Sequence, residues 1–425
     1  MCVENNDINR YFENPDLIEE ADEDVDPDFL AQFLDEANSD KPPLLNKVMV
    51  PSELEADEAF EGELYGYIRE DTGYHCIVGW GSRKPSQALN AKVIGCIGQP
   101  VCIEAPYIRG ERTDEGLTFQ LITLSEDGQE TATPIKPDIY TIKQDVFSRN
   151  SGLIETGWLD DTLAFISGCG SVGSQVALQL ARSGVGRFIL CDTDCVEIHN
   201  ICRHQCSLKD VGRYKVDAVE ERILQINPNA EVTKFYMRIQ DVPRDRYAHL
   251  IIPKKTVFIG TCDNRIGNAA ACDIAYSYGS PFLAVGFMTR AWAGEIFICL
   301  PERHDICYRC AFKTQIENAE AAERRSHFYI GQEDLQKASF EPGLDVDLEY
   351  GVSLFDKVVL DVMNRFNKKY RMRIAHKMTQ FVVFSGSADR TYSNKFWDQC
   401  LPDPISWENL TFTEDCRRCD YCIRK

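Results

Sequence analysis

The chain has 425 residues, far more than the roughly 100–200 of a single domain, so at least two folded units are expected. Its 46 Lys and Arg side chains face 67 Asp and Glu side chains, a formal net charge of −21. This charge opposes a general attraction to polyanions and excludes nucleic acid as a main partner. Residues 1–60 hold 18 acidic and three basic side chains. We expect an acidic, disordered leader over residues 1–59, which serves solubility or docks on a basic partner surface.

Membrane insertion and secretion are not expected. No stretch approaches the ~18 consecutive apolar residues of a membrane span, and acidic residues follow Met1 where a signal peptide would be basic and then apolar. Most of the 18 cysteines stand singly in apolar runs, which is typical of small core residues. We therefore expect a cytoplasmic protein with a reduced core.

Short β-forming runs separated by turn residues predict a small β-rich domain over residues 60–143. The runs are ELYGYI, HCIVGW, KVIGCIG, VCIEAPYI, TFQLITL and ETATPI. This region offers no metal cluster and no nucleophile with a neighbouring base, so we expect a scaffold or a docking module. We interpret His75 as a packed core histidine rather than a ligand.

From Thr162 onward, strand and helix patterns alternate, which predicts an α/β domain with a largely parallel sheet over residues 144–425. Strands are expected at LAFISG, FILCD, EVTKFYM, VFIGTCD, PFLAVGF and WAGEIFICLP. Helices are expected at 171–183, 214–226 and 269–278. A late amphipathic helix is expected to bury Phe355, Val358, Val359, Val362 and Phe366.

The strand LAFIS leads into a glycine-rich loop, Gly168-Cys169-Gly170-Ser171-Val172-Gly173, which opens a helix. Such a loop presents backbone amides and a helix N-terminus to phosphate. Asp192 ends the next strand, where a ribose-binding acid is expected. A purely structural turn is the alternative, and these features alone also suit a dinucleotide oxidoreductase.

Two cations in the next segment favour a triphosphate over a dinucleotide. After Asp192, the sequence N-I-C-R contains Arg203 and the sequence D-V-G-R-Y-K contains Lys215. The sequence I-N-P ends the segment. A departing pyrophosphate needs added positive charge, whereas a nicotinamide cofactor is already served by the helix terminus. Surface ion pairs are the simpler interpretation of either cation alone.

The segment from Gly168 to Pro228, with Asp263-Asn264 and Cys307-Tyr308-Arg309-Cys310, resembles the ThiF/MoeB and ubiquitin-activating enzyme family. The resemblance implies a Rossmann-like adenylation domain that uses ATP to adenylate the C-terminal carboxylate of a small protein or peptide. It implies phosphate contacts from Gly168, Gly170, Gly173, Asn200, Arg203 and Lys215. Asp192 would bind ribose and Asp263 would bind magnesium, although Asp263 could instead only cap the following helix.

Arg149, in D-V-F-S-R, resembles the arginine that reaches ATP from a partner subunit in this family, which implies a homodimer. An exposed, unpaired arginine is the alternative. Two departures stand out. Asn268 occupies the position of a usual arginine, which Arg265 could replace, and residues 311–399 contain no cysteine for a thioester step.

Cys307 and Cys310 form one thiolate pair, and Cys416, Cys419 and Cys422 offer a second. Four thiolates make a closed structural zinc site, so we expect C-terminal zinc knuckles. We prefer Cys416 with Cys419 and leave Cys422 spare, because Asp420 tolerates a left-handed turn better than Ile423.

We therefore expect ATP- and magnesium-dependent adenylation of a ubiquitin-like or sulfur-carrier protein, with the β-rich domain recruiting that protein or a conjugating-enzyme-like acceptor. Bacterial ubiquitin-like conjugation systems, including those of antiviral defence, lie within the range of the family. The alternatives are an enzyme that tailors a ribosomal precursor peptide and the inactive half of a heterodimeric activating enzyme. Cys400 and Cys422 are the candidate thiols for a thioester, but we expect the product to leave as an adenylate.

Overall fold

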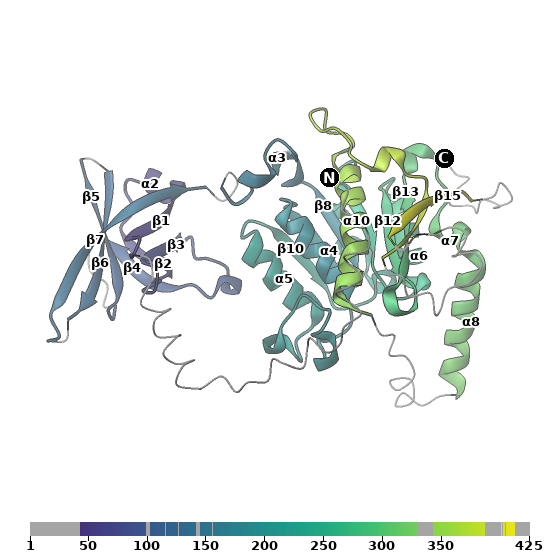
Figure 1. Cartoon of the computed structure of the whole chain (residues 1–425), viewed down its shortest axis with the longest axis horizontal. Coiled ribbons are helices and arrows are strands. Elements are labelled where there is room, and N and C mark those ends of the chain that lie inside the picture. Colours follow the sequence, from purple (N-terminus) through teal and green to yellow (C-terminus); the bar gives the residue numbers. More distant parts are fainter. Residues whose placement is uncertain are drawn as a thin grey trace, which may run out of the picture.

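The computed structural model describes residues 43–98, 103–114, 116–125, 127–141, 145–154, 156–329, 343–386, 401, 403 and 405–412. Two bodies are visible in Figure 1, a β-barrel at the left and an α/β body at the right. Among the described residues, no helix combines the length and the apolar character needed to cross a membrane.

A closed barrel of seven strands, in the order β1-β3-β2-β4-β5-β6-β7, forms the N-terminal body. The strands are β1 (Lys47–Pro51), β2 (Gly62–Tyr67), β3 (Tyr74–Trp80), β4 (Lys92–Ile97), β5 (Tyr107–Thr113), β6 (Gly116–Leu124) and β7 (Glu130–Tyr140). Two short helices accompany them, α2 (Ser52–Ala56) and the 3-10 turn η3 (Gln87–Leu89). The barrel encloses an apolar core that includes Val48, Leu64 and Ile77.

Strand β1 closes the barrel, because it pairs in parallel with both β3 and β7. It lies inside the range that we expected for the acidic leader, so the prediction of a leader extending to residue 59 was wrong from residue 47 onward. Its alternation is clear, since Val48 and Val50 are fully buried. The acidic residues that follow β1 made this alternation hard to recognise in the sequence. Residues 1–42 lie outside the described residues.

The α/β body contains an eight-stranded sheet in the order β10-β9-β8-β11-β12-β13-β14-β15. The first five strands in this order are parallel, and β13 to β15 are antiparallel. They are β8 (Leu163–Ser167), β9 (Arg187–Cys191), β10 (Glu231–Phe235), β11 (Thr256–Gly260), β12 (Phe282–Phe287), β13 (Ala293–Cys299), β14 (Phe381–Ser385) and β15 (Ser406–Leu410). The predicted alternation of strands and helices is thus confirmed.

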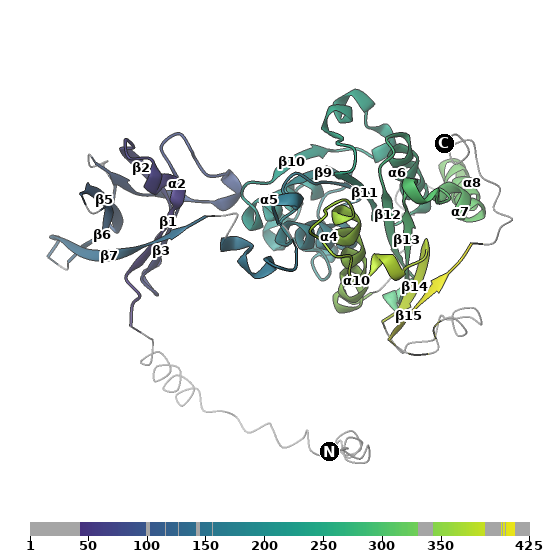
Figure 2. The same cartoon turned by 90° about the horizontal axis from the view of Figure 1, so that it is seen from above.

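Helices cover both faces of this sheet, and Figure 2 shows α6 on the opposite side of the strands from α4 and α10. The helices are α3 (Thr156–Leu159), α4 (Ser171–Arg182), α5 (Lys215–Ile226), α6 (Arg265–Ser277), α7 (Tyr308–Ala311), α8 (Lys313–Tyr329) and α10 (Asp345–Asn364). Phe366 lies beyond the end of α10 and is 39% exposed, so its predicted burial was wrong. The guanidinium of Arg365 covers its ring instead.

The two bodies meet where η3 lies against α5, the helix that Lys215 begins. The amide Nε2 of Gln225, in the last turn of α5, donates to the carbonyl oxygen of Ala88 at 3.0 Å. One end of α5 therefore lies at the barrel and the other at the residues that form the site described next.

Candidate adenylation site

The glycine-rich loop joins β8 to α4 at the carboxyl edge of the parallel strands. Gly168 adopts φ = +97°, and a Cβ there would lie 2.9 Å from the carbonyl oxygen of Thr261. A Cβ on Gly173 would lie 1.9 Å from the carbonyl oxygen of Gly168. Gly170 caps α4 and faces open space. The loop is thus pressed against the sheet on one side and open on the other, where an anion can approach the amides of the helix terminus.

Asp192 follows β9 and faces this loop. Its Oδ2 accepts the backbone N–H of Cys169 at 2.6 Å, and its Oδ1 accepts the N–H of Asp194 at 2.8 Å. Burial raises the pKa of Asp192, although these two hydrogen bonds and the charge of Lys215 act in the opposite direction. The carboxylate therefore lies beside the loop.

Lys215 begins α5 and reaches back to the same place. Its Nζ lies 2.9 Å from Oδ2 of Asp194, and its side chain is only 12% exposed. Burial lowers the pKa of Lys215, but the hydrogen bond to Asp194 and the charges of Asp192 and Asp194 outweigh this effect and raise it. A charged lysine is therefore held beside the glycine loop. The sequence singled out Lys215 but not its counter-ion Asp194.

Asn200 and Arg203 lie in the crossover between β9 and α5. The side-chain Oδ1 of Asn200 accepts the N–H of Glu197 at 3.0 Å and so caps its own turn. A phosphate contact from Asn200 would have to come from its amide Nδ2. Arg203 is half-buried, and its Nη1 lies 3.7 Å from the point that a Cβ on Gly343 would occupy, just before α10. Arg203 thus extends toward the start of α10.

His204 holds this crossover against the glycine loop, a role that the sequence analysis missed. Its Nδ1 accepts the N–H of Cys206 at 3.1 Å, so the proton lies on Nε2, which donates to the carbonyl oxygen of Cys169 at 2.8 Å. The side chain is buried, and this burial lowers its pKa. The signal in the sequence was its place directly after Arg203.

Asp263 follows β11 at the same edge and is exposed. The next residue, Asn264, caps α6, because its Oδ1 accepts the N–H of Gly267 at 2.8 Å. The alternative that Asp263 is the cap is therefore wrong. Nδ2 of Asn264 donates to Oδ1 of Asp263 at 3.1 Å and orients the carboxylate. An exposed carboxylate at this edge fits the oxygen ligand that magnesium requires.

Neither candidate for the usual arginine is placed to contact phosphate through its side chain. Asn268 is buried, and its Oδ1 accepts the N–H of Cys262 at 3.3 Å. Arg265 lies 2.7 Å from Glu295 and 2.9 Å from the hydroxyl of Tyr308. Arg265 therefore makes its contacts inside the domain.

The ThiF family matches residues 155–332, the part that contains the glycine loop, Asp192, Lys215 and Asp263. This part of the chain is a ThiF-family domain. The Escherichia coli sulfur carrier protein ThiS adenylyltransferase is 28% identical over 155 residues, which are 35% of this chain and 58% of that protein. The Bacillus subtilis tRNA threonylcarbamoyladenosine dehydratase is 43% identical over 95 residues, 21% of this chain and 37% of that protein.

A third relative, the Dictyostelium discoideum ubiquitin-like modifier-activating enzyme 5, is 25% identical over 200 residues, 42% of this chain and 52% of that protein. The chain thus spans less than two thirds of the length of each of these relatives. A crystal structure of Escherichia coli MccB with ATP is 18% identical with a TM-score of 0.43, over 62% of this chain and 68% of that one.

Arg149 lies just before the ThiF-family domain, in the exposed turn η5 (Ser148–Asn150). The neighbouring Asn150 donates from Nδ2 to the carbonyl oxygen of Arg182 at 2.9 Å. Arg182 ends α4, and a helix of 12 residues spans ~18 Å, so Arg149 lies at the far end of α4 from the glycine loop. The fold does not bring Arg149 to the site of its own chain.

Of the predicted zinc ligands, only Cys307 and Cys310 lie within the described residues. Cys307 is buried and caps α7, and Cys310 lies in α7. Cys416, Cys419 and Cys422 lie outside the described residues, as does Cys400. Within the described ranges, no three or more metal-binding side chains gather at one point. Cys307 and Cys310 fit half of a tetrahedral thiolate site, and zinc remains a prediction.

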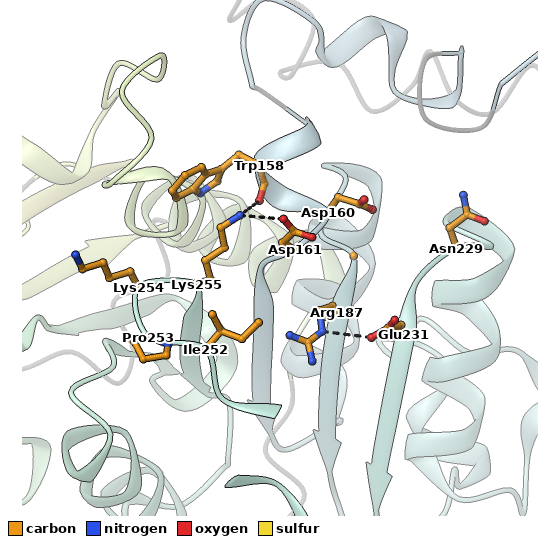
Figure 3. A pocket seen from close by; sticks show the side chains of 11 residues that line it. Trp158, Asp160, Asp161, Arg187, Asn229, Glu231, Ile252, Pro253, Lys254 and Lys255 are labelled. Carbon is orange, nitrogen blue, oxygen red and sulfur yellow. Dashed lines mark hydrogen bonds and ion pairs between the residues drawn. The ribbon is translucent and has the colours of Figure 1, made fainter. Parts of the chain in front are cut away.

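A cavity of about 870 Å³ opens at the opposite, amino edge of the parallel strands (Figure 3). Four of its charged side chains form two ion pairs: Arg187 lies 3.3 Å from Glu231, and Lys255 lies 3.3 Å from Asp161. Lys255 also covers the ring of Trp158. The cavity lies at the opposite edge of the strands from the glycine loop, so we do not assign the nucleotide to it.

Proposed function

We propose that this chain is an ATP- and magnesium-dependent adenylyltransferase that activates the C-terminal carboxylate of a ubiquitin-like or sulfur-carrier protein. The observation that supports this best is the largely buried ammonium of Lys215 beside the glycine loop, flanked by Asp192 and Asp194. An idle pocket has no need of this charge. The names of the ThiS adenylyltransferase and of the ubiquitin-like modifier-activating enzyme support the same reaction class.

In the proposed reaction, a carboxylate oxygen of the substrate attacks the α-phosphorus of ATP, and the bond to the β-phosphate oxygen breaks. The products are an acyl adenylate and pyrophosphate. Lys215 and Arg203 would stabilise charge on the phosphates, and the loop that contains Gly168, Gly170 and Gly173 would contact them. Asp192 would hold the ribose. Magnesium, held by Asp263, would neutralise the charge of the triphosphate.

The substrate protein is the finer part of the proposal. The relatives act, by name, on a sulfur carrier protein, on a ubiquitin-like modifier or on a tRNA modification, so the shared domain alone does not select the acceptor. We assign selection to the β-barrel, which would recruit the substrate or a conjugating-enzyme-like acceptor. Arg149 would complete the site of a partner subunit in a homodimer, and the reaction would take place in the cytoplasm.

Zinc would be held by Cys307, Cys310 and two of the three C-terminal cysteines, where it would stabilise the fold. Elemental analysis of protein purified under reducing conditions tests this assignment. One zinc ion per chain supports it, and protein without zinc contradicts it.

ATP–pyrophosphate exchange tests the activity. A small ubiquitin-like or sulfur-carrier protein that ends in glycine should support exchange, and the same protein without its last residue should not. If only a precursor peptide supports exchange, the substrate is a peptide rather than a small protein. Absence of both exchange and ATP binding would favour a non-catalytic subunit.

A matched pair of lysine variants links this activity to the site. Lys215→Ala should lower exchange by about 100-fold or more, because the charge acts on the transition state. Lys209→Ala is the control, because Lys209 lies on the same crossover, is exposed and pairs with Glu221. Undiminished exchange in Lys215→Ala would contradict the assignment.

A further inference from the structure

Arg265 joins three structural elements next to the proposed magnesium site. It is the first residue of α6, two residues after Asp263. Its guanidinium lies 2.7 Å from Oε1 of Glu295 in β13 and donates to the hydroxyl of Tyr308 at 2.9 Å. It also lies over the ring of Phe312, 4.1 Å from the ring centre. These contacts anchor the N-terminus of α6 to the sheet and to the segment that carries Cys307 and Cys310.

The glutamate end of the ion pair between Arg265 and Glu295 is shielded from water, whereas the Arg265 side chain is 25% exposed. Glu295 is 8% exposed, and burial raises its pKa even though the neighbouring guanidinium lowers it. Such a pair contributes little net stability, because both charges lose their hydration. Its effect is geometric, since the buried carboxylate of Glu295 holds the guanidinium of Arg265 at a fixed point.

Tyr308 connects Arg265 to the segment from Cys307 to Cys310. Its hydroxyl accepts from Arg265, and its backbone N–H donates to the sulfur of Cys272 in α6 at 3.3 Å. The next residue, Arg309, lies 3.1 Å from Asp273, also in α6. The segment from Cys307 to Cys310 therefore lies along α6 and is held to it at three positions.

The orientation of the Asp263 carboxylate depends on the same first turn of α6. Its carboxylate accepts the Nδ2–H of Asn264, and Oδ1 of Asn264 accepts the N–H of Gly267. The first turn of α6, which begins with Arg265, therefore sets the direction of the Asp263 carboxylate.

We propose that Arg265 and Tyr308 are positioning residues, which relay the position of the Cys307–Cys310 segment to Asp263 and thereby set the magnesium affinity of the adenylation site. The proposal rests on the proposed function in one respect, that Asp263 binds magnesium. Neither residue touches the substrate. Both act through the first turn of α6, so that disturbance of the cysteine segment weakens magnesium binding at a distance.

The test removes single hydroxyl groups. Tyr308→Phe deletes the acceptor of Arg265 and keeps the ring, which packs edge-on against Phe282 and Phe297. Tyr278→Phe is the matched control, because Tyr278 is the C-cap at the opposite end of α6. The magnesium concentration for half-maximal ATP–pyrophosphate exchange should rise about 10-fold in Tyr308→Phe, with the maximal rate retained at high magnesium, and should not change in Tyr278→Phe.

A second measurement needs no nucleotide. Hydrogen exchange of the amides of residues 261–268 should be faster in Tyr308→Phe than in the wild type, and unchanged in Tyr278→Phe. Arg265→Leu alone would leave Glu295 buried without its counter-ion, so the double variant Arg265→Leu/Glu295→Leu is used, which replaces the ion pair by two apolar side chains. It should raise the magnesium requirement at least as much as Tyr308→Phe.

The outcomes separate the two proposals. Wild-type magnesium dependence and wild-type hydrogen exchange in both Tyr308→Phe and the double variant would overturn the relay and leave the adenylation proposal intact. A wild-type protein that binds no ATP with magnesium would overturn the proposed function. The hydrogen-exchange comparison would then still decide whether Arg265 and Tyr308 order the Asp263 turn.

Discussion

The Nε2 of His204 lies 2.8 Å from the carbonyl oxygen of Cys169, so that a buried imidazole connects the crossover to the glycine loop. His204→Phe should lower the free energy of unfolding by about 1–3 kcal/mol, because it leaves this carbonyl and the N–H of Cys206 unpaired. Urea unfolding measures the change. A variant as stable as the wild type would show that the connection has no energetic role.

The same residue predicts a pH dependence. Burial lowers the pKa of His204 in the folded state, with Lys215, Asp192 and Asp210 as the charged groups around it. The unfolded chain therefore takes up a proton near pH 6.5 that the folded chain refuses, and stability should fall as the pH decreases below this value. His204→Phe should show a smaller loss between pH 7 and 5. An unchanged pH profile would contradict the burial argument.

Asp263→Ala should abolish magnesium-dependent exchange and leave the fold intact, because Asp263 is exposed and Asn264 supplies the helix cap. Asn264→Ala is the informative comparison. It should lower stability by about 1 kcal/mol through the lost cap and should raise the magnesium requirement. Exchange at the wild-type rate in Asp263→Ala would rule out a magnesium ligand at this position.

Asp356 offers a stability prediction far from the site. It is 3% exposed in the middle of α10, and within the described ranges neither of its carboxylate oxygens has a hydrogen-bond partner. Burial raises its pKa well above the usual value. Asp356→Leu should therefore raise the free energy of unfolding at pH 7 by about 1–3 kcal/mol.

The same carboxyl group predicts a pH dependence of stability. Because the folded-state pKa of Asp356 is raised, the unfolded chain releases a proton near pH 4 that the folded chain keeps, and stability is lost as the pH rises from this value. Asp356→Leu should remove that loss. Asp361→Leu is the control in the same helix and should destabilise, because Asp361 accepts the backbone N–H groups of Arg373, Ile374 and Ala375. Destabilisation by both variants would refute the argument.

We expect no stable thioester on this chain. Burial raises the pKa of Cys262, beside Asp263, to about 11, and raises the pKa of Cys169 and Cys191 as well, so these thiols are poor nucleophiles at neutral pH. Together with the lack of a cysteine in residues 311–399, this favours release of the activated substrate as an adenylate. A non-reducing gel after incubation with ATP, magnesium and the substrate protein should show no adduct. A thiol-sensitive adduct that disappears in Cys202→Ser, Cys400→Ser or Cys422→Ser would identify a nucleophile and contradict this expectation.

The sequence predicted those parts of the site that local spacing encodes. The glycine loop, Asp192 and Lys215 follow the ends of strands or begin helices, and parallel strands bring such positions to one edge. It did not predict Asp194 as the partner of Lys215, because either neighbouring acid could have faced the lysine.

The contacts of His204 and Arg265 could not be predicted from the sequence for a different reason. Each depends on segments about 30 or more residues apart, His204 with Cys169 and Arg265 with Glu295 and Tyr308. The pairing of such segments is fixed by the packing of helices on the sheet, which hydrophobic periodicity does not specify. The prediction for Arg265 was left open, and its side chain proved to be engaged inside the domain.

The parallel pairing of β1 with both β3 and β7 has a practical consequence for shortening the chain. A protein that starts at residue 60, where the acidic run suggests a boundary, would lack the strand that closes the barrel. Two strand edges would then be unpaired and open to association with other chains. A protein that starts at residue 43 keeps all seven strands, and it should remain monodisperse in gel filtration under conditions where the shorter one aggregates.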